Sequence, residues 1–169
     1  MRWATTNVDA PETFAAKPED FGLYYQWGKN VGWSVVGSLI STNGDTTWDK
    51  NIVSGEVWES ANDPCPDGWQ VPSYDDFEAL DDDSKVDNTW TALGGINGRL
   101  FVDKSTEKSI FLPAVGYRNT DGSAYIQGGD GFYWSSDIGY GYSLLSYGSN
   151  TKSDNDYYPF GFAVRCVRK

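Results

Sequence analysis

Carboxylates are the side chains of this sequence that could do acid and base chemistry, because the chain of 169 residues contains no histidine. Without histidine, neither a Ser-His-Asp or Cys-His catalytic arrangement nor an imidazole metal site can form. A glycosidase-like pair could combine Asp75 or Glu78 with Glu56 or Glu59. With 24 acidic residues in the chain, however, some such pair is always available. We therefore expect no catalysis, and a glycosidase-like enzyme is our third interpretation.

The acidic balance of the chain limits its partners. A net charge of −11 excludes nucleic acid as the expected ligand, since binding a polyanion needs Lys and Arg gathered on one face. The run Asp81-Asp82-Asp83 is typical of a solvated helix end or loop. We expect no cofactor, although a structural calcium ion held by aspartate oxygens stays open.

The chain has two cysteines, Cys65 and Cys166. If they are bridged, closing so long a loop stabilises the fold by about 4 to 5 kcal/mol through the entropy of the unfolded chain. In a reducing compartment they would instead be two buried thiols. The residues alone leave both possibilities open.

A segment near the C-terminus has the composition of a recognition surface. Tyr133 to Asn150 holds five aromatic rings among Gly, Ser and Asn, with a single charge. Tyrosine offers a large contact area for two side-chain torsions, and Ser, Gly and Asn offer adaptable hydrogen bonds. For Tyr142, inside a predicted strand, packing on its own domain is an equal alternative. The predicted ligand-binding residues are Asp137, Gly139, Tyr140, Tyr142, Tyr147, Ser149, Asn150, Ser153, Asn155, Tyr157 and Tyr158.

The same segment suggests a hypothesis about its origin. From Asp137 to Phe160, every residue type except Lys152 can be encoded by a codon that ends in a pyrimidine. Adenine-directed mutagenesis of Asn-type codons by a diversity-generating retroelement leaves this pattern, although many loops rich in Gly, Ser and Tyr also have it. We therefore treat residues 137–158 as a candidate variable segment.

Short strands and loops must hold this segment. Ser73 is a good N-cap, and it predicts a helix over Tyr74 to Leu80. A second short helix is expected over Asn88 to Leu93, ended by Gly94-Gly95. The length and composition predict one domain over residues 1–169. Strands are predicted at Arg99 to Val102, Ser109 to Tyr117, Gly131 to Ser135, Tyr142 to Tyr147, and Phe160 to Val167.

Other aromatic residues are expected to serve the scaffold. The rings of Gly22 to Trp33 are too many for a solvated loop, so we expect them under the sheet. In the last predicted strand, Cys166 and Arg165 are expected to point to opposite faces.

Six motifs carry a family resemblance. They are Trp3 to Val8, Asp20 to Gly28, Asp63 to Ser73, Phe111 to Arg118, Gly131 to Ser136, and Gly161 to Arg168. Together they cover nearly the whole chain and are similar to consecutive motifs of the Fibrobacter succinogenes major paralogous domain. The resemblance implies an α+β domain of the C-type lectin-like fold, with two short helices, small antiparallel sheets and long loops. It also implies a disulfide between Cys65 and Cys166, and buried rings of Tyr133 and Trp134 that anchor the start of the variable segment.

The family's relatives narrow the expected function. The formylglycine-generating branch needs closely spaced cysteines, and Cys166 stands alone in its region. The Glu-Pro-Asn and Trp-Asn-Asp tripeptides of calcium-dependent lectins are absent. We therefore expect a non-catalytic domain that binds a protein or glycan, related to the variable proteins of diversity-generating retroelements. The alternative is a structural or adhesive domain that packs on a neighbouring domain or subunit.

The expected location is the cell surface or the secreted fraction of a bacterium or phage. No window approaches the roughly 20 apolar residues of a membrane span. Met1 to Ala4 does not begin a secretory signal with a charged start and an apolar run.

Overall fold

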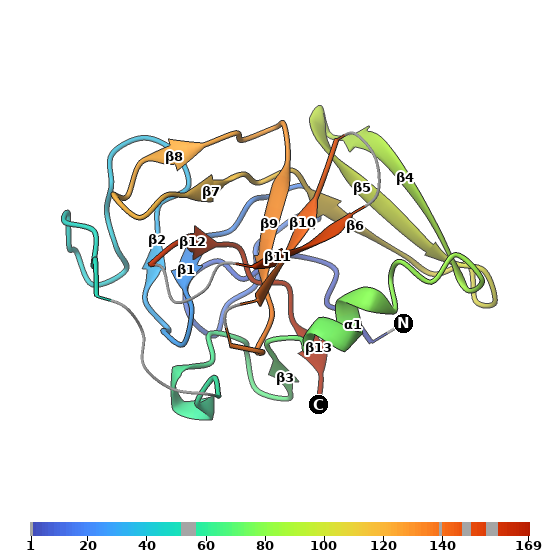
Figure 1. Cartoon of the computed structure of the whole chain (residues 1–169), viewed down its shortest axis with the longest axis horizontal. Helices are drawn as coiled ribbons and strands as arrows, with labels where there is room; N and C mark the ends of the chain where they lie inside the picture. The colour runs from blue at the N-terminus through green and yellow to red at the C-terminus, as the bar shows by residue number, and fades with distance from the viewer. Residues whose placement is uncertain (1, 52–56, 139, 147–149, 155–158) are drawn as a thin grey trace.

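The computed structural model describes residues 2–51, 57–138, 140–146, 150–154 and 159–169, with the backbone alone for residues 151–154. Antiparallel strands make up most of the regular secondary structure, and they form several small sheets joined by long loops (Figure 1). No helix in the described ranges is long and apolar enough to cross a membrane.

Four sheets make up the described fold. The five-stranded sheet has the order β2 (Gly32–Trp33), β1 (Tyr24–Gln26), β12 (Gly161–Phe162), β7 (Tyr117–Arg118), β8 (Ala124–Tyr125). One three-stranded sheet has the order β11 (Thr151–Asp154), β10 (Tyr140–Leu144), β9 (Gly131–Trp134). The other has the order β4 (Val86–Leu93), β5 (Ile96–Asp103), β6 (Ser109–Pro113). A two-stranded sheet pairs β13 (Val167–Arg168) with β3 (Trp69–Gln70).

The predicted first helix is present but shorter than expected. It is α1, Tyr74–Glu78, and its N-terminus carries a full capping box. The Ser73 side chain accepts a hydrogen bond from the Asp76 backbone N–H, and the Asp76 carboxylate accepts one from the Ser73 backbone N–H. These bonds satisfy two donors that a helix start leaves unpaired. The other helical piece in the described chain is the 3-10 turn η1, Ser60–Asn62.

The second predicted helix is wrong, and so is the expected α+β fold of the C-type lectin-like class with two helices. Asn88 to Leu93 lies within strand β4, which pairs with β5 from Val86↔Asp103 to Leu93↔Ile96. Gly94 and Gly95 both have positive φ, 58° and 85°, so they form the two-residue turn of a hairpin. The described fold is therefore mostly β.

Two of the predicted strands are interrupted. Ser109 to Tyr117 divides into β6 and β7, and the chain turns between them at Gly116. A Cβ on Gly116 would lie 2.1 Å from the Tyr125 carbonyl oxygen, so only glycine fits there. Phe160 to Val167 divides into β12 and β13. The predicted alternation of this run is confirmed, because Phe162, Val164 and Cys166 lie in one buried cluster and Ala163 and Val167 in the other. Both faces are buried, Arg165 included.

The core is built largely from aromatic rings. The rings of Gly22 to Trp33 are buried as predicted, with Tyr24 and Tyr25 fully inaccessible. Two clusters of buried side chains lie on either side of the five-stranded sheet's central strands, one around Tyr24 and Phe77, the other around Tyr25 and Trp134. The five-stranded sheet thus contributes to both clusters.

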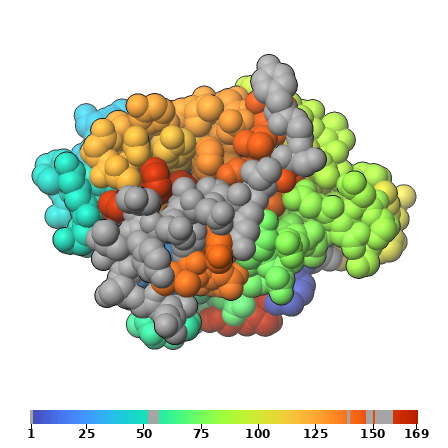
Figure 2. All heavy atoms as spheres, in the orientation of Figure 1, coloured from blue at the N-terminus to red at the C-terminus, as the bar shows by residue number. Residues whose placement is uncertain are grey.

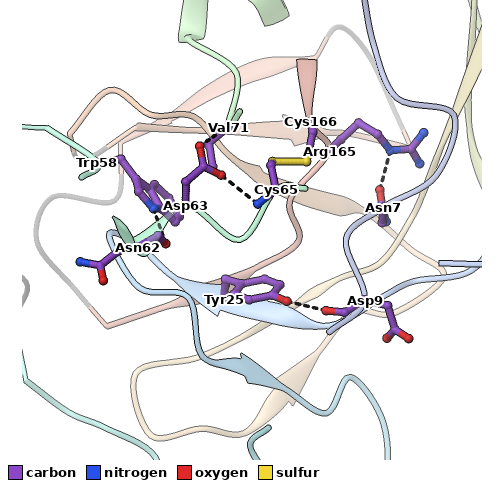
Figure 3. Close-up of a disulfide and its surroundings, with 10 residues drawn as sticks. All are labelled: Asn7, Asp9, Tyr25, Trp58, Asn62, Asp63, Cys65, Val71, Arg165 and Cys166. Carbon is purple, nitrogen blue, oxygen red and sulfur yellow. Dashed lines mark hydrogen bonds between the residues drawn. A yellow bond between two sulfur atoms is a disulfide. The ribbon is translucent and has the colours of Figure 1, made fainter. Parts of the chain in front are cut away.

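The disulfide between Cys65 and Cys166 is formed, as the resemblance implied (Figure 3). Asp63 shapes the turn before it, because its carboxylate accepts the backbone N–H groups of Cys65, at 2.9 Å, and of Val71, at 3.2 Å. Burial raises the pKa of Asp63, and these two bonds partly oppose that rise.

Candidate recognition surface

The candidate variable segment starts from a rigid hairpin. Strands β9 and β10 pair antiparallel, and β9 is anchored by two buried rings. The Trp134 ring stacks on Phe162 with centroids 4.1 Å apart, and its indole N–H donates to the Tyr25 carbonyl. The Tyr133 hydroxyl donates to the Pro113 carbonyl at 2.7 Å. Tyr133 and Trp134 are therefore scaffold, as predicted.

Tyr142 packs on its own domain. Its side chain is 1% exposed, and its ring stacks on Phe77 of α1 with centroids 4.5 Å apart and planes 12° from parallel. The hydroxyl donates to Asp81 Oδ2 at 2.5 Å. Burial, followed by the negative charge of Asp81, raises the pKa of Tyr142 far above its usual value. A buried neutral tyrosine in this position supports the surface from below.

Asn150 is held by the same carboxylate. Its side-chain amide donates to Asp81 Oδ1 at 2.7 Å, so Asp81 binds both β10 and the residue that precedes β11. The Asn150 side-chain oxygen is buried and has no hydrogen-bond partner among the described residues. Asp81 and Asp82 are half-buried and Asp83 is exposed, so the prediction of a solvated run over residues 81–83 holds fully only at its last member.

Arg99 fixes the point where the chain leaves β10. Its guanidinium donates to the Leu145 carbonyl at 2.7 Å and to the Asn88 side-chain oxygen at 2.7 Å. Leu144 is fully buried and Leu145 half-buried, so the chain returns to the core here. Arg99, on β5, thereby connects the hairpin of β4 and β5 to the start of the next loop.

Tyr140 and Asp137 lie over the start of α1. The rings of Tyr140 and Tyr74 are 6.4 Å apart, and both side chains are half-buried. Asp137 is exposed, and its carboxylate accepts the Tyr74 backbone N–H at 2.5 Å. The favourable position of a carboxylate at a helix N-terminus explains this contact. The structure thus gathers Asp137, Tyr140, Tyr142 and Asn150 around α1 and Asp81.

The side-chain periods of strand β10 and helix α1 together produce this arrangement. Tyr140 and Tyr142 are two residues apart on a strand and therefore lie on the same face. Tyr74 and Phe77 are three residues apart on a helix and also share a face. The two tyrosines of β10 consequently meet the two rings of α1 in order. Figure 2 shows β9 and β10 in orange beside the green of α1 and β4 on one face of the molecule.

Several predicted contact residues lie wholly or in their side chains outside the described part of the structure. Ser153, on β11, pairs with Gly141 of β10, but its side chain is not among those described. Four carboxylates were candidates for a catalytic pair. Asp75 and Glu78 are exposed on α1, Glu59 is also exposed, and Glu56 lies outside the described residues. Within the described ranges, no group of three or more metal-ligating side chains is arranged to hold an ion. The predicted contacts outside the described residues are Gly139, Tyr147, Ser149, Asn155, Tyr157 and Tyr158.

Sequence reasoning missed three residues that position this surface. Phe77, Asp81 and Arg99 hold Tyr142, Asn150 and Leu145 in the ways described above. The helix period that places Phe77 beside Tyr74 was a usable signal. Asp81 was hidden in an acidic run, and the partner of Arg99 is a main-chain carbonyl, which has no signature in the sequence.

Comparison of the chain with family models, with curated proteins and with solved structures finds no match.

Proposed function

We propose that the chain is a non-catalytic recognition domain that binds a protein or glycan ligand through residues 137–158 together with the exposed face of α1. The two ends of this segment support the proposal. The chain enters it from the buried residues Tyr133 to Ser135 and leaves it into the buried run of residues 161–167. Binding residues are commonly carried by loops that a rigid scaffold positions.

The strongest support for the proposal is the way in which Tyr142 is anchored. Its ring on Phe77 and its bond to Asp81 supply a fixed support within the segment. Tyr140 lies two residues earlier, half-buried, and next to exposed Asp137. We therefore assign ligand contact to Tyr140 and Asp137 and a supporting role to Tyr142 and Asn150. Diversification of residues 137–158 by a retroelement remains part of the hypothesis, as does membership of the resembled family.

The disulfide bears on the compartment. Disulfides persist in oxidising surroundings, so Cys65–Cys166 supports a secreted or surface-displayed domain. The same location suits the alternative function, a structural or adhesive domain that packs on a neighbour.

The test is a binding screen of the purified chain against glycans and extracellular proteins, followed by variants. Tyr140→Ala combined with Tyr147→Ala should weaken binding to the ligand found by at least tenfold. Tyr125→Ala is the matched control, because Tyr125 is 50% exposed on β8, outside the segment. Unchanged binding by the double variant would refute the assignment of the surface.

Size-exclusion chromatography distinguishes the alternative. If the wild-type chain forms a stable oligomer and the double variant is a monomer, a packing or adhesive role is favoured. Turnover of any glycan by the purified chain would instead favour an enzyme.

A further inference from the structure

A groove at the open end of the β4–β5 hairpin is lined mostly by residues outside the proposed recognition surface, with Asp76 of α1 at its edge. Two hollows, of about 370 and 240 Å³, adjoin each other there, because Lys85 and Asp103 line both. The larger volume is within the range of about 300 to 1,000 Å³ typical of small-molecule sites. In Figure 1 the N-terminus lies beside α1 and below this end of the hairpin.

Cations gather in this groove, although the whole chain carries a charge of −11. Arg2, Lys85 and Lys104 line the hollows. The Lys104 backbone N–H donates to the Lys85 carbonyl at 2.9 Å, so the two lysines are neighbours across the ladder. Like charges in neighbouring positions repel each other. A bound anion between them would relieve this repulsion.

A ligand can replace the present ion-pair partners of the two lysines at a small cost in free energy. Lys85 pairs with Asp82 at 2.7 Å, and the Lys85 side chain is 77% exposed. Lys104 pairs with Asp87 at 3.0 Å and donates to the Asp83 carbonyl at 2.6 Å. Exposed ion pairs contribute about 0 to 1 kcal/mol. Asp82 also accepts the backbone N–H and the hydroxyl of Ser84, so it keeps partners if Lys85 turns to a ligand.

Acceptors for hydroxyl groups lie in the same groove. Asp103 Oδ1 accepts the backbone N–H groups of Ser105 and Thr106 and the Ser105 hydroxyl. In the described part of the chain its Oδ2 has no partner. Asp76 similarly uses Oδ2 for Ser73. One carboxylate oxygen of each can therefore accept a hydrogen bond from a ligand hydroxyl.

The floor of the groove is apolar. Trp3, Leu80 and Val86 line it and are at most 9% exposed. A ligand that fits these three features has a carboxylate, several hydroxyls and an apolar C–H face. We propose that the groove binds an acidic sugar of the uronic-acid class, with its carboxylate on Lys85 and Lys104 and its hydroxyls on Asp103 and Asp76.

The test is an NMR titration of the full chain with glucuronate. Saturable shifts of the backbone amides of Lys85, Lys104 and Ser105 are expected. Glucose, which lacks the carboxylate, and acetate, which lacks the hydroxyls, should each bind at least tenfold more weakly. Lys85→Gln combined with Lys104→Gln should weaken glucuronate binding at least tenfold. Added salt should weaken it as well, because the groove is open to solvent.

Lys50→Gln is the matched control, since Lys50 is an exposed lysine that lines neither hollow. The lysine variants keep the fold if their thermal midpoints match the wild type. Absence of saturable shifts would overturn the proposal, as would equal losses in the Lys50 variant. Acetate binding as tight as that of glucuronate would also overturn it. Tyr140→Ala should leave glucuronate binding unchanged, so a failure here is separable from a failure of the proposed recognition surface.

Discussion

At the scale of single residues, buried arginines hold irregular backbone in place. Arg165 is fully buried, and its guanidinium donates to the Asn7 side-chain oxygen at 2.7 Å and to the carbonyls of Ala4 and Phe111 at 3.2 and 3.0 Å. Arg118 binds the carbonyls of Ser34 and Gly122 in the same manner. Burial lowers the pKa of Arg165 to about 10, so it is charged at neutral pH. Its hydrogen bonds must therefore offset the cost of desolvating that charge.

Arg165→Lys is predicted to lower the free energy of unfolding by about 3 kcal/mol. A lysine ammonium cannot reproduce the planar fork that reaches three acceptors, and it leaves at least one buried carbonyl unpaired. Urea unfolding at neutral pH measures the change. Arg168→Lys is the control, because Arg168 is exposed at the end of β13. A loss at residue 165 no larger than that at residue 168 would contradict this account.

At the scale of elements, β10 lies against α1 through two ring pairs of unequal burial. Tyr142 is 1% exposed and stacked on Phe77, whereas Tyr140 is half-buried near Tyr74. The two tyrosines share a strand face but not a role. Their tolerance of substitution should differ accordingly.

Tyr142→Ala is predicted to lower the free energy of unfolding by about 3 to 5 kcal/mol, and Tyr140→Ala by less than about 1 kcal/mol. Removal of the buried ring leaves a cavity beside Phe77 and removes a donor from Asp81. Chemical denaturation of the two variants in parallel measures the difference. Equal losses would show that both rings belong to the core, and the division of the segment into support and contact residues would then be wrong.

The elements also show what the sequence could predict. The start of α1 was predictable because an N-cap acts within one turn. The strand β4 was mistaken for a helix because Gly94-Gly95 signals both a helix end and a hairpin turn. Only pairing with β5, a non-local contact, decides between them. For the same reason, composition pointed to residues 137–158 as a candidate segment but could not separate buried Tyr142 from half-buried Tyr140.

At the scale of the whole molecule, the two ends of the chain are fastened together. The Ala4 backbone N–H donates to the Cys166 carbonyl at 2.8 Å, and the Arg168 N–H donates to the Arg2 carbonyl at 2.9 Å. Cys166 is also bonded to Cys65, across a separation of 101 residues. The pairing of the cysteines followed from the family resemblance and is confirmed, whereas their spacing alone left it open. The expected lectin-like architecture failed because motif identity does not determine how strands assemble into sheets.

Loss of the disulfide is predicted to lower the free energy of unfolding by about 4 to 5 kcal/mol, because the unfolded chain regains the entropy of a loop of about 100 residues. Cys65→Ala combined with Cys166→Ala tests this by denaturant unfolding, with the reduced wild type as a second route to the same state. The double variant should not respond to reductant, which makes it the control for other effects of the reagent. Equal stability of the oxidised and reduced wild type would mean that the paired termini and the aromatic core already hold this region without the covalent bond.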